Sequence, residues 1–230
     1  MCTAIAKKGN DLIYGFNLDI DPSVWNFKLL KTKHYFSVGI TVGSTTYLTH
    51  GINSDGQFGN VPYMNGEPYE IPKGKKRERI DLLNDRYIRG RYTSDDIDKI
   101  IEEKSIVNIP DITMHSLIGN KSGEFMIIEP GYGIKKITDD FAAITNFPIL
   151  ADLKNYDNPF YGKDRCDKAV SILKNSGADF SVNDALDLLK QVKQEGQWGT
   201  RISFVYSKNE NAVHYCLNGD FNNIMIHCFD

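Results

Sequence analysis

Hydrophobic and polar residues alternate along most of the first fifty residues, a pattern typical of half-buried β-strands. Glycine and asparagine residues, which favour turns, separate these segments. The same alternation returns in the middle of the chain and again near its C-terminal end. We predict strands at residues 3–8, 12–16, 26–32, 36–42, 45–51, 113–119, 124–130, 132–137, 141–146, 201–207, 212–218 and 222–229.

Four segments instead have the hydrophobic spacing of amphipathic helices. They cover residues 80–90, 95–106, 164–174 and 182–193. Thr93 or Ser94 is placed to cap the second helix. Ser181 is placed to cap the fourth, with Asp184 three positions further on. Such side chains satisfy backbone N–H groups that have no partner inside the helix, so they mark where each helix begins.

The predicted elements occur in the order strands, two helices, strands, two helices, strands. Hairpin-connected strands with helices grouped in pairs favour antiparallel sheets covered by helices. No repeat, low-complexity segment or linker divides the sequence. We therefore predict a single α+β domain over residues 1–230. The expected architecture is a four-layer αββα sandwich, in which helices flank two antiparallel sheets.

Charge and composition exclude several classes of function. The net charge of −3 and the isoelectric point near 6.0 give no electrostatic basis for binding nucleic acid or an anionic membrane. No apolar segment approaches the roughly 20 residues that span a bilayer, and no signal peptide is visible, so we expect a cytoplasmic protein. A basic run before the first predicted helix is interpreted as its solvated start; it comprises Lys73, Lys75, Lys76, Arg77 and Arg79.

The cysteines and the five histidines do not have the spacing of a metal site or of a Cys-x-x-Cys motif. We therefore expect neither a metal nor a cofactor. Cys216 and Cys228 lie in predicted strands, where we expect buried thiols. A disulfide between them is not expected in a cytosolic protein.

The opening Met1-Cys2-Thr3 is the sharpest chemical feature of the sequence. Methionine aminopeptidases remove an initiator methionine when the next residue is small, which would make Cys2 the first residue. Its α-amine, with an ordinary pKa of about 7.7–8.0, could then accept the proton of its own thiol. Nucleophile and base would belong to one residue. A cysteine at the second position has no such meaning by itself, so this interpretation depends on the rest of the chain.

Several blocks of the sequence resemble the choloylglycine hydrolase family, which includes bile salt hydrolases and penicillin V acylases. The opening Met-Cys-Thr is followed by Gly-Phe-Asn-Leu-Asp, which is similar to the family's Gly-Arg-Asn-Met-Asp. Later blocks are similar to the family's Gly-Met-Asn-Glu-Lys-Gly turn, its middle hairpin, its Leu-Thr-Asn-Ser-Pro segment and its Ser-Arg-Phe-x-Arg helix start. These blocks follow the family's order over most of the chain, at residues 15–19, 51–56, 106–112, 114–129, 144–148 and 164–169.

The resemblance implies an N-terminal-nucleophile amide hydrolase in which Cys2 attacks the amide carbonyl. Asp19 matches the aspartate that hydrogen-bonds the cysteine and orients its amine. Asn146 matches the asparagine that stabilises the oxyanion, and the backbone N–H of Tyr63 is the second expected donor. Arg165 matches the arginine beside the nucleophile, where a positive charge favours the thiolate. Taken alone, Asp19 and Asn146 could be turn residues and Arg165 a solvent-facing residue at a helix start.

The chain also departs from the family pattern. Phe16 stands where the family has an arginine, which removes a charge from the predicted pocket. Tyr63 is similar to the residue of penicillin acylases, where most bile salt hydrolases have asparagine. The interval between Asn146 and Arg165 is shorter than in typical members, which carry an oligomer-contacting insertion there. We therefore expect that any homo-oligomer differs from the family's tetramer.

The sequence thus predicts hydrolysis of a linear N-acyl amide through a thioester on Cys2. Candidate substrates are penicillin V, acyl-homoserine lactones, N-acyl amino acids and conjugated bile acids, the last being the least favoured. Transfer of the acyl group to an amine is an alternative. A non-catalytic relative that binds acyl amides is a second alternative, which Phe16 and any retention of Met1 would favour.

Five aromatic residues of the early loops could line an acyl pocket, although core packing is the better-supported role for most of them. They are Trp25, Phe27, Phe58, Tyr63 and Tyr69.

Overall fold

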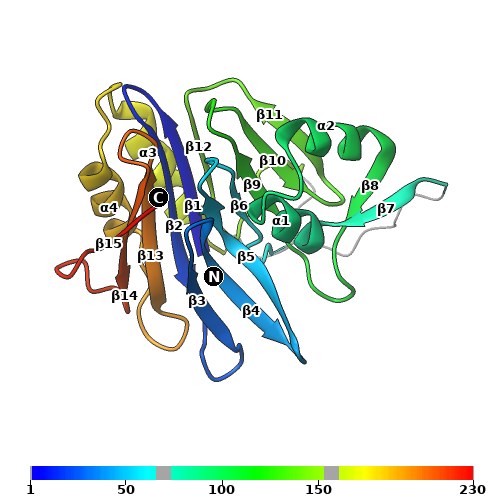
Figure 1. Cartoon of the computed structure of the whole chain (residues 1–230), viewed down its shortest axis with the longest axis horizontal. Helices are drawn as coiled ribbons and strands as arrows, with labels where there is room; N and C mark the ends of the chain where they lie inside the picture. The colour runs from blue at the N-terminus through cyan, green and yellow to red at the C-terminus, as the bar shows by residue number, and fades with distance from the viewer. Residues whose placement is uncertain (1, 66–73, 153–160, 230) are drawn as a thin grey trace.

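The computed structural model describes residues 2–65, 74–152 and 161–229. Within these ranges the strands form two large antiparallel sheets (Figure 1). The six-stranded sheet has the order β12-β1-β2-β13-β14-β15, and the seven-stranded sheet has the order β11-β10-β9-β6-β5-β4-β3. The first sheet contains β1 (Cys2–Lys8), β2 (Leu12–Asp19), β12 (Phe141–Ile144), β13 (Thr200–Ser207), β14 (Ala212–Leu217) and β15 (Met225–Cys228). The second contains β3 (Phe27–Lys31), β4 (Tyr35–Val42), β5 (Thr45–Asn53), β6 (Phe58–Asn60), β9 (Ser116–Gly119), β10 (Phe125–Glu129) and β11 (Gly133–Ile137).

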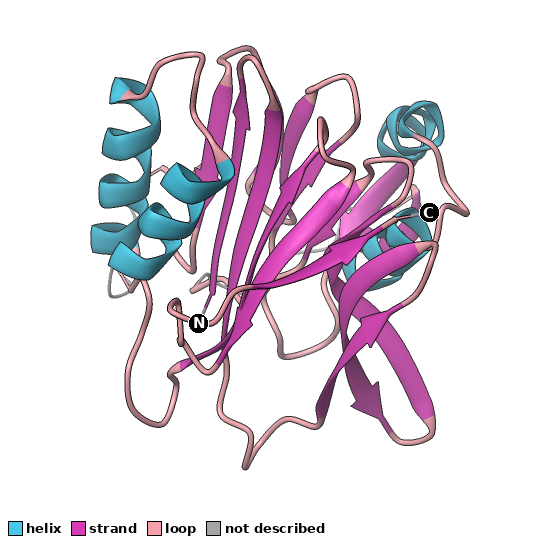
Figure 2. Ribbon diagram, turned by 60° about the vertical axis from the view of Figure 1, so that its left-hand side comes forward, coloured by secondary structure: helices cyan, strands magenta, loops and turns pink. Residues whose placement is uncertain are grey.

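A pair of helices covers the outer face of each sheet (Figure 2). The six-stranded sheet is covered by α3 (Lys163–Asn175) and α4 (Val182–Gln191). The seven-stranded sheet is covered by α1 (Ile80–Ile88) and α2 (Ser94–Glu103). The predicted α+β fold, a four-layer αββα sandwich, is therefore confirmed. No helix in the described ranges is long and apolar enough to cross a bilayer.

Each sheet contributes side chains to two hydrophobic clusters, because successive residues of a strand point to opposite faces. In β1, Ala4 and Ala6 face the other sheet, whereas Ile5 faces the helices. The cluster between the sheets is rich in aromatic residues, among them Tyr14, Phe16, Phe36, Phe58, Phe125 and Phe204. The cluster under α3 and α4 is mainly aliphatic, with Ile5, Ile13, Leu173, Leu186, Leu189 and Val205. The cluster under α1 and α2 includes Leu83, Tyr87, Ile97, Ile100, Ile118 and Ile128.

The predicted helix starts agree with the structure where a capping residue marked them. Thr93 is the N-cap of α2 and forms a capping box with Asp96. Ser181 is the N-cap of α4 and forms a capping box with Asp184. In both boxes the hydroxyl accepts from the third backbone N–H of the helix, which local sequence alone can specify.

Two predictions hold only in part around the pair β7 (Lys76–Arg79) and β8 (Lys104–Val107), which are parallel neighbours. The basic run is solvated as predicted in its described part, but Lys76–Arg79 form the strand β7, which leads directly into α1 with Arg79 as its N-cap. Lys73 lies outside the described residues. The second helix ends at Glu103 instead of continuing to residue 106, because Ile106 extends as a strand and packs into the cluster under α1 and α2.

The cysteine predictions hold in part. The structure contains free thiols at all four cysteines, so Cys216 and Cys228 form no disulfide. Cys216 is buried as predicted. Cys228 is exposed, because β15 is the outer strand of its sheet and alternate side chains of this strand face solvent.

Antiparallel pairing brings several chain segments together at one end of the six-stranded sheet. The start of β1 lies beside the end of β2, with Cys2 opposite Leu18. The end of β2 lies beside the start of β13, with Asp19 opposite Thr200. The end of β12 flanks β1 on its other side, with Ile144 opposite Ala4. Residues that are distant in sequence therefore meet around the first residue of β1.

Candidate active site

Cys2 lies at this end of the sheet, on the face of β1 that points toward the other sheet. Its side chain is buried, with 5% of the residue exposed. Its backbone nitrogen donates a hydrogen bond to Asn146 Oδ1 at 2.8 Å. This nitrogen becomes the α-amine if Met1 is removed, so the structure gives it a defined acceptor beside the thiol.

The surroundings of the thiol do not favour its ionised form. Burial raises the pKa of the Cys2 thiol, and the charge of Asp19 raises it further. The positive charge of the N-terminal amine, a backbone hydrogen bond from Asp19 and the positive charge of Arg165 lower this pKa, but they do not outweigh burial. Arg165 therefore acts in the predicted direction without producing a low thiol pKa. A thiol held in this way needs a nearby base to become a nucleophile.

Asp19 is also buried, with 1% exposure, at the end of β2. Thr200 Oγ1 donates a hydrogen bond to Asp19 Oδ1 at 2.5 Å, and Arg165 Nη1 lies 3.4 Å from Asp19 Oδ2. Burial raises the pKa of this carboxyl to about 7, although the bond from Thr200 and the charge of Arg165 both oppose the rise. Asp19 can therefore change its protonation state near neutral pH, which a turn aspartate in water would not do.

Arg165 lies at the start of α3, but it is buried and forms hydrogen bonds to several residues of the site instead of facing solvent. Only 7% of it is exposed. Its Nη1 donates to the backbone oxygen of Cys2 and to Thr3 Oγ1, both at 2.9 Å. Its Nη2 donates to Asn146 Oδ1 at 2.9 Å. With the Gln194 amide oriented to satisfy both groups, Gln194 Oε1 accepts from Arg165 Nε at 2.9 Å and Nη2 at 3.2 Å. The planar guanidinium therefore connects Cys2 with its neighbours on several sides.

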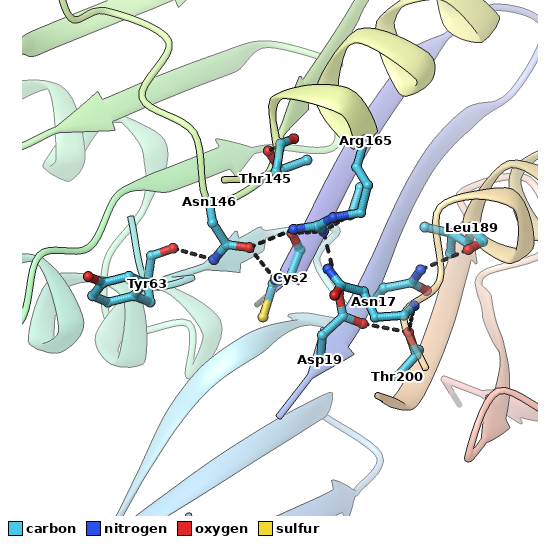
Figure 3. Close-up of polar contacts among 12 residues, drawn as sticks. Cys2, Asn17, Asp19, Tyr63, Thr145, Asn146, Arg165, Leu189 and Thr200 are labelled. Atoms are coloured by element: carbon cyan, nitrogen blue, oxygen red, sulfur yellow. Dashed lines mark hydrogen bonds and ion pairs between the residues drawn. The ribbon is translucent and has the colours of Figure 1, made fainter. Parts of the chain in front are cut away.

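Asn146 lies between Tyr63 and Arg165 (Figure 3). Its side-chain oxygen accepts hydrogen bonds from the nitrogen of Cys2 and from Arg165. These two donors fix the orientation of the amide, so that Nδ2 faces Tyr63 and donates to its backbone oxygen. An amide has two N–H bonds, and the second makes no hydrogen bond to the described residues. Asn146 therefore retains one N–H that could donate a hydrogen bond to an oxygen on which negative charge develops.

The backbone of Tyr63 is oriented by an isolated bridge with Met114. The hydrogen bonds of this bridge are made by the flanking residues, from Met64 N to the oxygen of Thr113 and from His115 N to the oxygen of Pro62. Tyr63 is therefore a non-hydrogen-bonded bridge residue, whose N–H and C=O both point away from Met114. Its C=O meets Asn146, and its N–H has no partner among the described residues. This arrangement suits the predicted second donor of an oxyanion hole.

The structure thus brings together the predicted residues Cys2, Asp19, Asn146 and Arg165, with Tyr63 beside Asn146. It adds residues that the sequence did not single out. Thr200 is among these, because only the pairing of β13 with β2 places it beside Asp19. The oxygen of Gly162, the residue before α3, accepts from Thr145 Oγ1 at 2.8 Å and so ties the helix start to the Asn146 turn. Among the described residues, no group of three or more histidines, cysteines, aspartates or glutamates could hold a metal ion.

Phe16, which replaces the family arginine, is fully buried between the sheets. Its ring stacks on His50, with centroids 4.4 Å apart and an interplanar angle of 19°. Burial lowers the pKa of His50 to about 3, so this ring is neutral near pH 7. An aromatic stack therefore occupies the position of the expected charge. Phe58 is likewise fully buried in the core, whereas Tyr63 is half exposed and Tyr69 lies outside the described residues.

No protein-family model matches the chain, and no curated protein sequence matches it. Solved structures do match. A mutant of the conjugated bile acid hydrolase from Clostridium perfringens superposes with a TM-score of 0.69 at 12% identity, covering 98% of this chain and 92% of that chain. Penicillin V acylase from Agrobacterium tumefaciens has a TM-score of 0.64 at 15% identity, covering 94% and 83%. The chain has the fold of the N-terminal-nucleophile hydrolases.

A third match is the Caenorhabditis elegans orthologue of N-acylethanolamine-hydrolyzing acid amidase. It has a TM-score of 0.52 at 16% identity, covering 89% of this chain and 92% of that chain. At these identities the likeness establishes the fold, and the fold implied by the sequence resemblance is confirmed.

Proposed function

We propose that this chain is an amide hydrolase that uses Cys2 as an N-terminal nucleophile after removal of Met1. The hydrogen bond between the Cys2 nitrogen and Asn146 Oδ1 carries the proposal. It places the future α-amine, the thiol and an amide donor within one buried cluster. The elevated pKa of the thiol adds support, because a neutral thiol requires an adjacent base and the α-amine is on the same residue.

The reaction then proceeds in two steps, acylation of Cys2 and hydrolysis of the resulting thioester. The neutral α-amine accepts the thiol proton as sulfur attacks the amide carbon, and the oxygen of the tetrahedral intermediate is stabilised by Asn146 Nδ2 and the Tyr63 N–H. The C–N bond breaks as the ammonium returns this proton to the leaving amine, which leaves an acyl thioester on Cys2. Water, deprotonated by the α-amine, attacks the thioester. The carboxylic acid departs and the thiol regains its proton.

Asp19 and Arg165 would tune this cycle without touching the substrate. Arg165 fixes the Asn146 amide and the carbonyl of Cys2, so the nucleophile and the oxyanion donor share one support. Asp19, bonded to Thr200, offers a carboxyl of adjustable charge beside Arg165. A negative charge there favours the protonated amine, which would be required when the leaving group is protonated.

The substrate class follows from the apolar surroundings of the thiol. Cys2 faces the hydrophobic cluster between the sheets, and the Phe16–His50 stack carries no charge near neutral pH. Tyr63, a half-exposed aromatic residue, meets Asn146 through its backbone oxygen (Figure 3). These features favour an N-acyl amide with an uncharged alkyl or aryl acyl group. Penicillin V, acyl-homoserine lactones, N-acyl amino acids, N-acylethanolamines and conjugated bile acids all carry such an acyl group, so the panel that tests the proposal includes each of these classes.

Intact-protein mass spectrometry tests the proposal with a panel of these amides and a glycine-conjugated bile acid. We expect a mass that lacks Met1, release of amine, and a transient acyl adduct on the protein. Hydrolysis should disappear in Cys2→Ala. The exposed thiol of Cys228 is the matched control, because Cys228→Ser should retain both the adduct and the activity. Formation of a new amide when a primary amine is added would instead identify acyl transfer.

A second variant separates the amine from the thiol. Inserting an alanine between Met1 and Cys2 leaves the thiol in the chain but converts its nitrogen into a peptide nitrogen. We expect this protein to fold and to lose hydrolysis. Retained Met1 in the natural chain, together with no cleavage of any panel member, would contradict the proposal and favour a binding protein.

A further inference from the structure

A histidine and a glutamate form a fully buried pair beside the candidate site. His115 precedes β9 and Glu129 ends β10, and both are 0% exposed. His115 Nδ1 lies 2.8 Å from Glu129 Oε1. Burying two such groups is costly unless their hydrogen bonds are satisfied, so the position of every partner is informative.

The second nitrogen of His115 reaches the backbone next to Asn146. Nε2 lies 2.5 Å from the oxygen of Thr145. A carbonyl oxygen can only accept, so Nε2 must carry a hydrogen and donate it. The ring therefore fixes the carbonyl that immediately precedes Asn146.

Glu129 holds the other end of the same turn. Its Oε1 accepts from Ile149 N at 2.7 Å, and its Oε2 accepts from Leu150 N at 2.6 Å. The pair therefore forms hydrogen bonds to both ends of the turn at residues 145–150, and Asn146 lies between these contacts. Neither side chain is exposed to water, so packing and hydrogen bonds hold both in place, and this limits the movement of the Asn146 amide.

The backbone of His115 contacts the segment that carries Tyr63, the second donor of the proposed oxyanion hole. Its N–H donates to the oxygen of Pro62 at 3.3 Å, in the bridge that orients Tyr63. A single residue thus contacts both segments, the Tyr63 segment through its backbone and the Asn146 turn through its ring. The spacing between the two oxyanion donors depends on where this residue lies.

We propose that His115 is a positioning residue that sets the distance between the Asn146 and Tyr63 donors, with Glu129 fixing its ring and the far end of the Asn146 turn. The inference rests on the proposed function, because it concerns the same oxyanion hole. Displacing a preorganised donor by about 1 Å costs on the order of a hundredfold in rate. Such a loss falls on the transition state, so kcat should decrease while KM stays nearly constant.

The test compares three variants of the pair with one distant control. His115→Phe removes both ring hydrogen bonds, His115→Gln retains one side-chain N–H donor, and Glu129→Gln replaces one of the two acceptor oxygens by a donor. Glu78→Gln is the matched control, because Glu78 is a buried carboxylate that pairs with Arg86 and Lys104 far from Cys2. Each protein is assayed for kcat and KM on the panel amide that the wild type cleaves fastest, and its thermal midpoint is measured.

We expect kcat to fall about tenfold to a hundredfold in His115→Phe and Glu129→Gln, with KM within about threefold of the wild type. His115→Gln should lie between His115→Phe and the wild type. Glu78→Gln should lower the thermal midpoint and leave kcat within about twofold.

Three results would overturn the proposal. The first is a folded His115→Phe or Glu129→Gln with wild-type kcat, and the second is an equal loss of kcat in Glu78→Gln. The third is loss of folding in all three variants of the pair, which would assign the pair to stability alone. A wild type that cleaves none of the panel amides contradicts the proposed function itself, and the inference falls with it.

Discussion

Asp19 couples the stability of the protein to pH, because its pKa in the folded state is about 7 and its ordinary value is 3.8. Between these two values the folded state holds a proton that the unfolded state releases. The contribution of Asp19 to stability is therefore largest below about pH 4 and is lost as the pH rises through 7. Asp19→Asn cannot ionise, so it should not show this loss.

Urea unfolding of both proteins between pH 4 and pH 8.5 measures this effect. We expect the unfolding free energy of the wild type, relative to Asp19→Asn, to fall by a few kcal/mol across this range. Because all other ionisable groups are shared, their contributions cancel in the difference. A difference that stays constant or rises with pH would show that Asp19 is ionised throughout.

Arg165 combines a charge with a particular shape, and two substitutions separate them. Arg165→Met removes the positive charge that lowers the pKa of the Cys2 thiol, so alkylation of Cys2 by iodoacetamide should require a higher pH. Arg165→Lys retains the charge but cannot reach Cys2 O, Thr3 and Asn146 together. It should keep the alkylation midpoint nearly unchanged and still lose about tenfold to a hundredfold in kcat.

A Cys228→Ser background removes the exposed thiol, and peptide mass spectrometry then distinguishes label on Cys2 from label on the buried thiols of Cys166 and Cys216. Arg201→Lys is the control, because the side-chain hydrogen bonds of Arg201 within the described chain go to the backbone oxygens of Ile20, Gly196 and Gln197. An Arg165→Met protein with an unchanged alkylation midpoint would contradict the electrostatic role.

Individual residues differ in how far the sequence could reveal them. Cys2, Asp19, Asn146 and Arg165 lie in blocks whose order resembles a known family, so they could be named before any contact was seen. Thr200 gave no such signal, because a threonine at a strand start is ordinary. Its place beside Asp19 depends on the register of β13 against β2, which no local pattern specifies.

The start of α3 depends on a glycine that no other residue can replace without movement. Gly162 has a φ of 81°, and a Cβ there would lie 2.9 Å from Arg165 Nη2 and 3.0 Å from Thr145 Oγ1. Gly162→Ala should therefore destabilise the fold by more than the roughly 1–2 kcal/mol of left-handed backbone strain and displace Arg165. We expect both a lower thermal midpoint and a lower kcat.

Gly43→Ala provides the matched control for this prediction. Gly43 also has a positive φ, of 60°, but a Cβ there meets no atom within 4 Å. It lies in the turn between β4 and β5, so the same backbone strain should lower stability without changing kcat. Equal effects of the two substitutions on kcat would show that the start of α3 does not position Arg165.

A helix or strand could be predicted where the residues that specify it are close together in the sequence. The starts of α2 and α4 were predicted because Thr93 and Ser181 each form a capping box within four residues. The strands β7 and β8 were missed because their parallel pairing joins segments on either side of two helices. Their polar and charged residues resemble a solvated helix surface until that pairing is known.

The whole molecule depends on one core between its two sheets. Phe204 of the six-stranded sheet lies with its ring centroid 5.4 Å from that of Phe36 and 6.4 Å from that of Phe58, both in the seven-stranded sheet. Because the inner faces of the two sheets are buried against each other, separating the sheets would expose this core to water, and neither sheet could keep its helix pair ordered. We therefore predict that the chain unfolds as a single cooperative domain.

Phe204→Ala tests this cooperativity, because Phe204 is fully buried at the junction of the two sheets. Removing such a ring costs about 3–5 kcal/mol. In a chain of this length, that cost corresponds to a fall of roughly 10 °C in the thermal midpoint. Far-UV circular dichroism, which reports on the helices, and the fluorescence of Trp25 and Trp198 should shift together. Ile226→Ala, at an exposed position of β15, should leave the midpoint within about 1 °C. Two separated transitions, or a shift in one probe alone, would contradict this prediction, because each sheet would then fold independently with its own helices. The site at the end of β1 would in that case depend mainly on the stability of the six-stranded sheet.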